Sequence, residues 1–283
     1  MTAVMPSVIQ ARNETCVTGM VLSAAAERAD GLALVPDAPG QHPAKTYSYA
    51  RLAATVEAAA SGLAWRGLRA RDVVGVLVPD AASFILARHA IHAVGGVPSP
   101  VDPGLSLAEM AGQLAESGAR MLITGPPLAE QALAAADRSW VRQVFSFADA
   151  PGTTPFRDLL GVDIVRPDSS RADDVALMPF SRGQDGRLRP IPLTHREACV
   201  QLGRVDAEVC LSAGDVVLVT PPGADGLSYT LATDSAMLRG ATVVATATGD
   251  LAGSARRHTA TAAIVPPDGA ADVPAGVRVI PLG

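Results

Sequence analysis

The sequence predicts an α/β protein, with helices covering both faces of mostly parallel sheets. Three observations predict this class: segments with helical hydrophobic spacing alternate with short β-branched runs, prolines and glycines separate the two kinds of segment, and 48% of the 283 residues are hydrophobic. Alternation of helix and strand favours parallel sheets because parallel strands need a crossover connection, which is usually a helix. The hydrophobic fraction is ample for a substantial core.

The first half of the chain shows this alternation most clearly. Residues 49–67 place leucine, valine and alanine at helical spacing, and Gly67 closes the segment. Ser106 followed by Glu109 forms a capping box, so a helix is expected to begin there and to end at residue 117 or 118. The remaining expected elements are strands at 72–78, 120–124 and 141–147, helices at 82–94 and 128–138, and a short extended piece at 97–101.

Residues 150–174, which are rich in Pro, Gly, Asp and Ser, form the expected boundary or long connection. The sequence therefore predicts two sheet-and-helix subdomains, 1–174 and 175–283. In the second subdomain the expected strands are 175–180, 215–220, 242–248, 260–265 and 277–281, and the expected helices are 196–211, 227–239 and 250–258.

Composition excludes several classes of function. The formal net charge is −5 and only 4% of residues are aromatic, whereas a nucleic-acid partner needs a basic face with arginine or aromatic platforms. The three cysteines form no Cys-Xaa-Xaa-Cys spacing, and we find neither a signal peptide nor an apolar run of about 20 residues. We expect a cytoplasmic protein that binds neither nucleic acid nor membrane. Arginine-rich usage, with Lys45 the only lysine, indicates a GC-rich bacterial genome.

Three segments carry a family resemblance. Residues 46–49 read Thr-Tyr-Ser-Tyr before the first helix, Asp102-Pro103 precedes the capping box, and residues 180–195 read FSRGQDGRLRPIPLTH. In this order they resemble the adenylate-forming superfamily of acyl-CoA synthetases, aryl-CoA ligases and adenylation domains. The last fragment aligns without a gap to that family's phosphate loop, Tyr-Ser-Ser-Gly-Thr-Thr-Gly-Leu-Pro-Lys-Gly-Val-Xaa-Leu-Thr-His. From about residue 22 to residue 283, the resemblance implies two subdomains like the first part of the family's large N-terminal domain, with its C-terminal domain absent.

The resemblance also identifies candidate site positions. They are the phosphate-loop residues Ser181, Arg182, Gly183, Gln184, Asp185, Gly186, Arg189 and Thr194. The loop keeps two glycines, which let backbone N–H groups approach an anion. Gln184 and Asp185 replace two threonines, and an aspartate repels a triphosphate. Arg189 replaces the lysine, and Pro190 removes a backbone donor.

Two interpretations of this degenerate loop stay open. The loop is either a weakened anion site served by Arg182, Arg187 and Arg189, or a solvent-exposed, arginine-rich turn. The family's aromatic–histidine pair is missing from residues 220–227, which read TPPGADGL. The family's adenine-binding segment, its metal-binding glutamate and its catalytic lysine have no counterpart in the sequence, and Lys45 matches no family motif.

We therefore expect a truncated relative that cannot adenylate alone, with no catalytic residue, no metal site, and ATP and Mg²⁺ bound only weakly or with a partner chain. Three hypotheses follow. The protein binds a carrier protein, an acyl or CoA-type ligand, or an enzyme of the same biosynthetic pathway; it is one half of a split acyl-adenylating enzyme; or it is a residual enzyme with a repurposed pocket. Truncation would expose an apolar face, so we also expect a homo-oligomer or a protein partner.

Other polar pairs receive structural interpretations. His89 and His92 are three residues apart on an expected helix, but no third metal ligand of suitable spacing follows. His195 is expected to pack at the start of a helix. The carboxylates at 173 and 174 are expected to be solvated. Cys199 and Cys210 are expected to be small core residues on one helical face.

Overall fold

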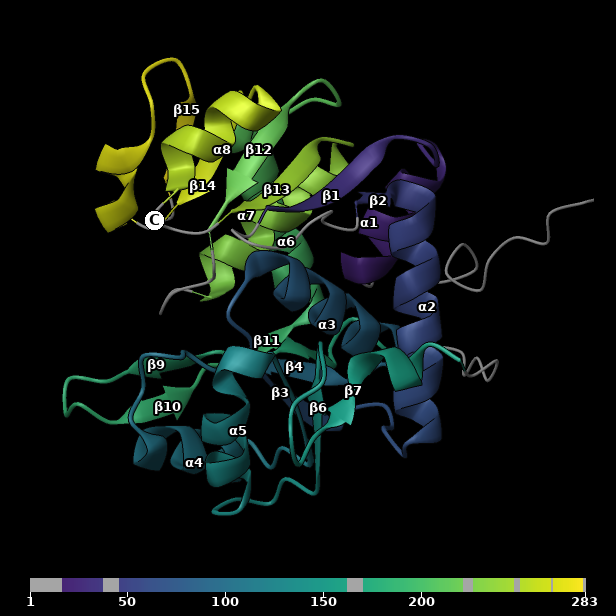
Figure 1. Ribbon diagram of the computed structural model, residues 1–283, viewed down its shortest axis with the longest axis vertical. Coiled ribbons are helices and arrows are strands. Elements are labelled where there is room, and N and C mark those ends of the chain that lie inside the picture. The colour runs from purple at the N-terminus through teal and green to yellow at the C-terminus, as the bar shows by residue number, and fades with distance from the viewer. Residues whose placement is uncertain are drawn as a thin grey trace, which may run out of the picture.

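Two sheets with flanking helices form the body of the protein (Figure 1). The computed structural model describes residues 17–37, 46–161, 170–220, 226–246, 250–265 and 267–281. One sheet has six strands in the order β15-β14-β12-β13-β1-β2, and the other has five in the order β4-β3-β5-β6-β7. All neighbouring strands in these two sheets are parallel except the pair β1 and β2. The predicted α/β class is confirmed.

The five-stranded sheet matches the expected elements closely. Its strands are β3 (Val73–Leu77), β4 (Val97–Pro100), β5 (Met121–Thr124), β6 (Gln143–Ser146) and β7 (Thr154–Pro155), and its helices are α3 (Ala81–Ala93), α4 (Leu107–Glu116) and α5 (Ala129–Ala136). The capping box at the start of α4 is present: the Ser106 side chain accepts from the Glu109 N–H, and the Glu109 side chain accepts from the Ser106 N–H at 3.0 Å.

The six-stranded sheet contains β1 (Leu32–Asp37), β2 (Tyr47–Ser48), β12 (Val216–Val219), β13 (Thr242–Thr246), β14 (Ala262–Val265) and β15 (Arg278–Pro281). Its helices are α6 (His195–Val209), α7 (Gly226–Leu238) and α8 (Leu251–His258). Strand β1 pairs in parallel with β13, about 200 residues later in the sequence. The sheets therefore do not follow the expected boundary between residues 174 and 175.

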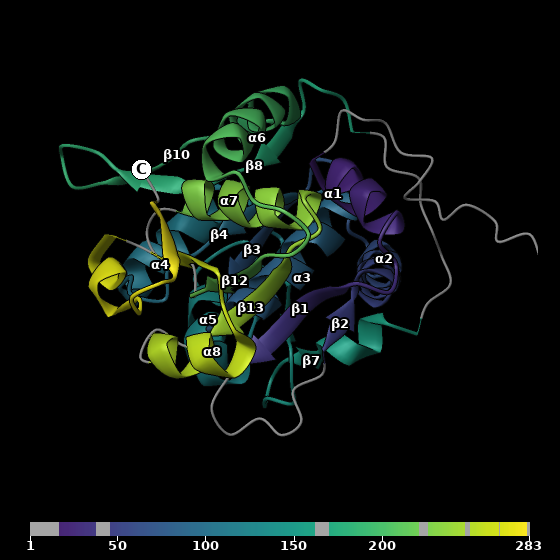
Figure 2. The ribbon, with the colours of Figure 1, turned by 90° about the horizontal axis from the view of Figure 1, so that it is seen from above.

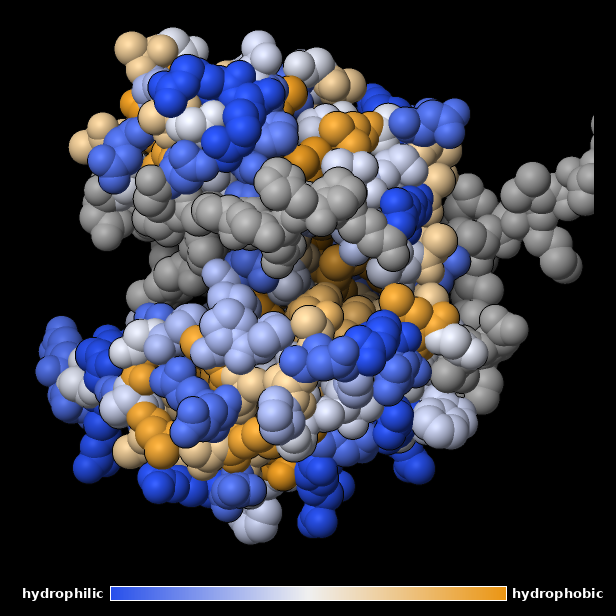
Figure 3. Space-filling model, in the orientation of Figure 1, coloured by the Kyte–Doolittle hydropathy of each residue, from blue (hydrophilic) through white to orange (hydrophobic). Residues whose placement is uncertain are grey.

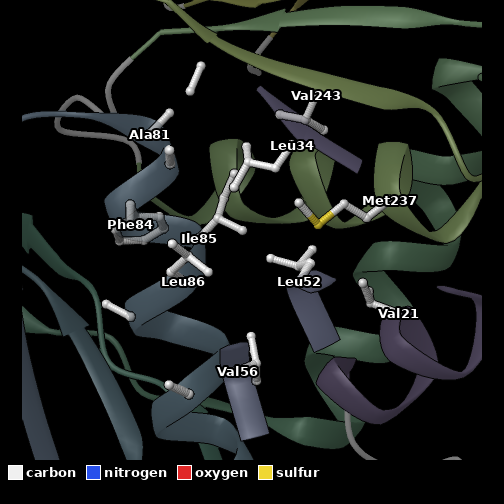
Figure 4. Packing of buried hydrophobic residues seen from close by; sticks show 14 of the residues in the cluster. Val21, Leu34, Leu52, Val56, Ala81, Phe84, Ile85, Leu86, Met237 and Val243 are labelled. Atoms are coloured by element: carbon white, nitrogen blue, oxygen red, sulfur yellow. The ribbon is translucent and has the colours of Figure 1, made fainter. Parts of the chain in front are cut away.

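Helices α1 (Val17–Ala26), α2 (Tyr49–Trp65) and α3 pack beside or between the sheets. In Figure 1, α2 runs along one side of the molecule from the six-stranded to the five-stranded sheet. Figure 4 shows Leu52 and Val56 of α2, Ile85 of α3 and Met237 of α7 meeting in one buried cluster with Leu34 of β1. This shared core joins the two halves of the chain.

The connection between the halves is anchored to α2. The short 3₁₀ helix η2 (Phe156–Leu159) lies against it, and a Cβ added to Gly62 would stand 2.2 Å from the Leu159 carbonyl oxygen. Only glycine allows this close approach. Within the described part of 150–174, η2 is therefore packed against the core through the buried side chains of Phe156 and Leu159. Within the described ranges, no helix is long and apolar enough to cross a membrane.

One expectation about the cysteines is wrong. Cys199 is half-buried on α6, but Cys210 is exposed and caps that helix with a left-handed backbone, φ 48°. A helix that ends in this conformation turns its last residue off the helical face, so the periodicity of α6 does not extend to Cys210.

Candidate functional site

Residues 180–190 of the fragment at 180–195 fold as a β-hairpin that projects from the body (Figures 1 and 2). Its strands are β9 (Phe180–Arg182) and β10 (Leu188–Pro190), with Arg189 opposite Ser181 and Pro190 opposite Phe180. The expected strand at 175–180 is divided, because β8 (Val175–Leu177) ends before Pro179 and pairs instead with β11 (Leu193–Thr194). The hairpin thus has its own pairing, separate from both large sheets.

Backbone groups at the tip of the hairpin bond to one another. The Gly183 N–H donates to the Arg187 carbonyl at 2.9 Å, and the Gly186 N–H donates to the Gly183 carbonyl at 2.9 Å. Gly186 has φ +76°, a conformation that glycine adopts without strain. These N–H groups are therefore used inside the turn rather than directed at a ligand.

The Asp185 carboxylate occupies two further donors at the turn. Its Oδ1 accepts from the Arg187 N–H at 3.1 Å, and its Oδ2 accepts from Arg189 Nη2 at 2.5 Å. Both side chains are exposed. A carboxylate is itself an anion, so Asp185 takes the positions that a phosphate oxygen would need at the cation and at the backbone N–H. Gln184, beside it, is also exposed.

Arg182 ties the hairpin to α4. Its Nη2 donates to Glu109 Oε1 at 2.8 Å, and its Nη1 donates to the Gly186 carbonyl at 2.7 Å. The Ser106 hydroxyl and the Arg182 guanidinium together lower the pKa of Glu109 to about 2. The sequence predicted Glu109 only as a capping residue, and its partnership with Arg182, 73 residues away, had no local signal.

Thr194 has a structural role at the base of the hairpin. It is the N-cap of α6, and its side chain accepts from the Glu197 N–H at 3.2 Å while Glu197 Oε2 accepts from the Thr194 N–H at 2.9 Å. His195 follows, is buried, and packs edge-on against His92 with ring centroids 5.9 Å apart. The predicted packing role of His195 is consistent with this contact.

A cavity of about 470 Å³ lies between the hairpin and the carboxyl ends of β3 and β4. Its walls are Val76, Val78, Phe84, Pro100, Val101, Asp102, Pro103, Gly104, Leu105, Gln113, Pro179, Phe180, Ser181, Arg182 and Leu188. In α/β proteins, ligands bind beyond the carboxyl ends of parallel strands, and a cavity of this volume suits a small molecule. The phosphate-loop positions Ser181 and Arg182 and the Asp102-Pro103 pair, all singled out in the sequence, meet at this cavity.

Hydrogen bonds beside the cavity attach the segment before the hairpin to β4. Gln113 Nε2 donates to the Pro100 carbonyl at 2.6 Å, and the Ser99 hydroxyl donates to the Met178 carbonyl at 2.9 Å. The Met178 N–H in turn donates to the Pro98 carbonyl at 3.0 Å. The segment that enters the hairpin is therefore attached to β4, and the hairpin has a fixed base.

The histidine pair belongs to a separate buried network. The Nδ1 atoms of His89 and His92 each lie 2.9 Å from the Thr18 hydroxyl. Arg88 forms a bidentate ion pair with Asp234 of α7, both fully buried. Burial, reinforced by nearby cationic groups, holds the pKa of both histidines well below the usual value. The carboxylates of Asp173 and Asp174 pair with Arg196 and Arg71, respectively.

The hairpin does not fit a nucleotide triphosphate with its magnesium ion. Asp185 brings negative charge to the tip, Arg189 is paired with it, and the glycine N–H groups bond within the turn. Among the described residues, no group of three or more His, Cys, Asp or Glu side chains is placed to hold a metal. Residues 221–225 and Lys45 lie outside the described residues.

Two buried hydroxyls mark a second polar region near the ends of β12 and α7. Tyr229 Oη and Thr220 Oγ1 are buried and have no hydrogen-bond partner among the described residues. Tyr229 packs edge-on against Phe84, a wall of the cavity, with ring centroids 6.0 Å apart. Buried hydroxyls normally have partners, so this region is open to a polar group supplied from outside the described residues.

Comparison with known proteins gives a consistent result. Residues 22–275 match the sequence profile of a family described as AMP-binding enzyme. The chain is similar to 4-coumarate–CoA ligase 3 of Arabidopsis thaliana, with 27% identity over 242 residues that cover 79% of this chain and 42% of that protein. It is 28% identical to a feruloyl-CoA synthase of Amycolatopsis over 204 residues, 72% of this chain and 40% of that protein. The chain thus spans well under half the length of these relatives.

Solved structures show the same fold. A long-chain-fatty-acid–CoA ligase from Archaeoglobus fulgidus matches with a TM-score of 0.79 at 18% identity, over 90% of this chain and 52% of that one. The apo structure of MbtA from Mycobacterium smegmatis matches with a TM-score of 0.75 at 26% identity, over 91% of this chain and 49% of that one. The alignment over nearly the whole chain agrees with the two-sheet architecture.

Proposed function

Because the chain belongs to the family of AMP-binding enzymes, we propose that its described part is a binding relative of the carboxylate–CoA ligases that does not adenylate by itself. The hairpin aligned with the family's phosphate loop keeps its turn but not its chemistry. In this proposal the protein is a pseudoenzyme of a bacterial acyl or secondary-metabolite pathway. A cytoplasmic location agrees with the unbridged thiols of Cys199 and Cys210.

One observation carries this proposal: the Asp185 carboxylate accepts from Arg189 Nη2 at 2.5 Å and from the Arg187 N–H at 3.1 Å. Adenylation requires the loop to stabilise negative charge on the transferring phosphate. A triphosphate would have to displace Asp185 and then lie beside it. The resulting repulsion between like charges opposes nucleotide binding at this loop.

The cavity of about 470 Å³ is the proposed binding site. Apolar walls from Val76, Phe84 and Leu188 would contact the hydrocarbon or ring of an acyl group, and Ser181 and Arg182 would contact its polar end. The relatives named for 4-coumarate and ferulate support an acyl or aryl carboxylate, or its CoA conjugate, as the ligand class. A carrier protein that presents such an acyl group is the corresponding protein partner.

The test combines turnover and binding. The purified chain is incubated with ATP, Mg²⁺ and 4-coumarate, ferulate or a fatty acid, and ATP–pyrophosphate exchange is measured. We expect exchange at the background rate, together with a rise in Tm when an acyl-CoA or acid ligand is present, since ligands that bind only the folded state stabilise it. Exchange above background that is lost in Arg189→Ala would overturn the proposal.

A second candidate is one part of an adenylating enzyme whose remaining segments are supplied by another polypeptide. The retained turn of the hairpin, with Gly186 at φ +76°, and the TM-score of 0.79 favour this candidate. Exchange activity that appears only when the carboxyl-terminal portion of a complete relative is added would distinguish it from the binding role.

Association with a second copy or with another protein remains a proposal. Ile191, after β10, and Val200, on α6, are about half exposed, at 50% and 53%, and exposed large apolar side chains favour contacts with a partner. Light scattering at micromolar concentration is expected to give a mass above that of one chain, 28.9 kDa. A monomer mass that is independent of concentration would contradict self-association.

A further inference from the structure

Four arginines surround one hollow at the amino-terminal edge of the five-stranded sheet, opposite the hairpin. The hollow has a volume of about 480 Å³ and is lined by Arg66, Arg69, Arg120 and Arg142. Arg66 and Arg69 follow the end of α2, while Arg120 and Arg142 directly precede β5 and β6. In Figure 3 the lower rim of the molecule is mostly hydrophilic.

The backbone forces two of these arginines together. β5 and β6 are parallel, with Met121 opposite Gln143, and the Arg142 N–H donates to the Arg120 carbonyl at 2.8 Å. Neighbouring strands lie about 5 Å apart, so adjacent cationic side chains repel unless an anion lies between them. The fold therefore keeps like charges adjacent at a position where repulsion opposes stability.

These guanidinium groups have no carboxylate partner. Elsewhere in the described residues arginine is commonly paired, as in Arg157 with Asp149 and Arg239 with Asp206. Among the described residues, none of the four arginine side chains forms an ion pair or donates a hydrogen bond. The buried Nε of Arg66 likewise has no hydrogen-bond partner there. The one carboxylate in the lining, Asp72, accepts from the Arg69 backbone N–H at 2.9 Å. The lining thus carries a net positive charge in an acidic protein.

Both tryptophans of the sequence flank the hollow. Trp65 is 58% exposed and lies beside Arg66, whose Cζ is 5.2 Å from the centroid of its ring. Trp140 is 66% exposed and lines an adjoining hollow of about 260 Å³, together with Gly118 and two of the arginines. Exposed planar rings beside unpaired guanidinium groups suit a ligand that has a planar part as well as an anionic part.

We propose that this arginine hollow, lined by Arg66, Arg69, Arg120 and Arg142, binds a small organic phosphate. The phosphate is held among the guanidinium groups, whose planar fork matches its oxygens, and a ring or other planar part lies against Trp140. A small molecule fits better than an extended polyanion because the four arginines line one concave site. The site is independent of the hairpin, which lies at the other edge of the sheet.

Tryptophan emission reports on this site directly, since both tryptophans adjoin it. The probes are phenyl phosphate, inorganic phosphate and pyrophosphate, titrated into the whole protein at low salt. We expect a saturable change in emission, and we expect phenyl phosphate to bind more tightly than inorganic phosphate in the wild type. In Trp140→Phe the two ligands should bind about equally, and the change in emission should be smaller. Raising the salt concentration should weaken binding.

Charge-reversal variants complete the test. Arg120→Glu/Arg142→Glu should raise the Kd more than tenfold, whereas Arg204→Glu/Arg256→Glu, two exposed arginines outside the hollow with the same change in net charge, should leave it within twofold. Arg189→Ala in the hairpin should also have no effect. Circular dichroism checks that each variant is folded. If Arg120→Glu/Arg142→Glu is not folded, Arg120→Gln/Arg142→Gln replaces it.

Several results would overturn the proposal. One is the absence of a saturable change in emission with 10 mM phosphate probes. Another is equal loss of phosphate binding in the control variant Arg204→Glu/Arg256→Glu. The third is unchanged phosphate binding in Arg120→Glu/Arg142→Glu. A phosphate carried by a lipid is tested by flotation with phosphatidylcholine vesicles containing phosphatidate. Binding to these vesicles, or to polyglutamate, without a response to soluble phosphates would assign the site to a membrane or to an acidic protein instead.

Discussion

The buried pair of Arg88 and Asp234 allows a quantitative test of how the two halves of the chain hold together. Arg88 Nη1 donates to Asp234 Oδ2 at 2.9 Å, and the exposed fractions of the two side chains are 1% and 0%. Arg88 Nη2 also lies 3.1 Å from His89 Nε2. Burial raises the pKa of Asp234, and the Arg88 guanidinium opposes that rise. The pair joins α3 to α7, 146 residues apart.

The perturbation is Asp234→Ala, which leaves the guanidinium buried without its counterion. Removing one partner of a buried pair costs about 3–5 kcal/mol in the free energy of unfolding. For a chain of this size, each kcal/mol lowers Tm by roughly 2–4 °C, so we expect Tm to fall by roughly 6–20 °C. Urea denaturation followed by circular dichroism gives the free energy, and a thermal scan gives Tm.

Two further variants separate charge burial from simple loss of contact. Arg88→Met/Asp234→Leu removes both charges and should recover most of the lost stability, because replacing a buried ion pair with apolar groups is often neutral. Asp149→Ala breaks the exposed pair with Arg157 and should leave Tm essentially unchanged. The reasoning is refuted if Asp234→Ala costs less than about 1 kcal/mol, or if the double variant is as unstable as the single one.

Three other predictions follow from packing and charge. Burial lowers the pKa of both His89 and His92, so their contribution to the free energy of unfolding is complete above the unfolded-state pKa near 6.5. Below that pH the contribution falls by about 1.4 kcal/mol per pH unit for each histidine. A urea midpoint that stays constant between pH 7.5 and pH 5 would contradict this. In Gly62→Ala the new Cβ would stand 2.2 Å from a carbonyl oxygen, so the free energy of unfolding should fall by about 1–3 kcal/mol or more. In Gly112→Ala on α4, where the space is open, the same denaturation assay should show no change or a gain in stability. Glu109→Ala removes the hairpin's anchor to α4, so trypsin should cut the hairpin faster than in the wild type; equal rates would show that the anchor does not restrain it.

Sequence reasoning succeeded where the physical signal is local. The capping box of Ser106 and Glu109 places the start of α4 within the sequence itself, and the β-branched runs that became β3 and β12 need only burial on both faces. The family resemblance added the order of these elements, which local patterns cannot fix. The resemblance also identified the loop at 180–195, its two glycines and its substituted positions, but it did not predict that the loop folds as a hairpin.

The features that the sequence did not predict involve contacts between distant residues. Strand β1 has no strong pattern of its own and becomes a strand by pairing with β13, so the division at 174 did not coincide with the sheets. The contacts of Arg182 with Glu109 and of Arg88 with Asp234 depend on how the elements pack. The pairing of Asp185 with Arg189 was also not predicted, although residues four apart across a tight turn can meet and the sequence contained that signal.

The most direct test of the account is a calorimetric titration of ATP with Mg²⁺ into the wild type and into Asp185→Ser. If Asp185 closes the hairpin to phosphate, the wild type should show no saturable ATP binding that depends on Arg189, whereas binding in the arginine hollow would be unaffected by Arg189→Ala. Asp185→Ser, which frees Arg189 and restores a hydroxyl, should bind ATP at the hairpin at least about tenfold more tightly than the wild type does, a difference of about 1.4 kcal/mol. Micromolar binding by the wild type that Arg189→Ala abolishes would contradict the account.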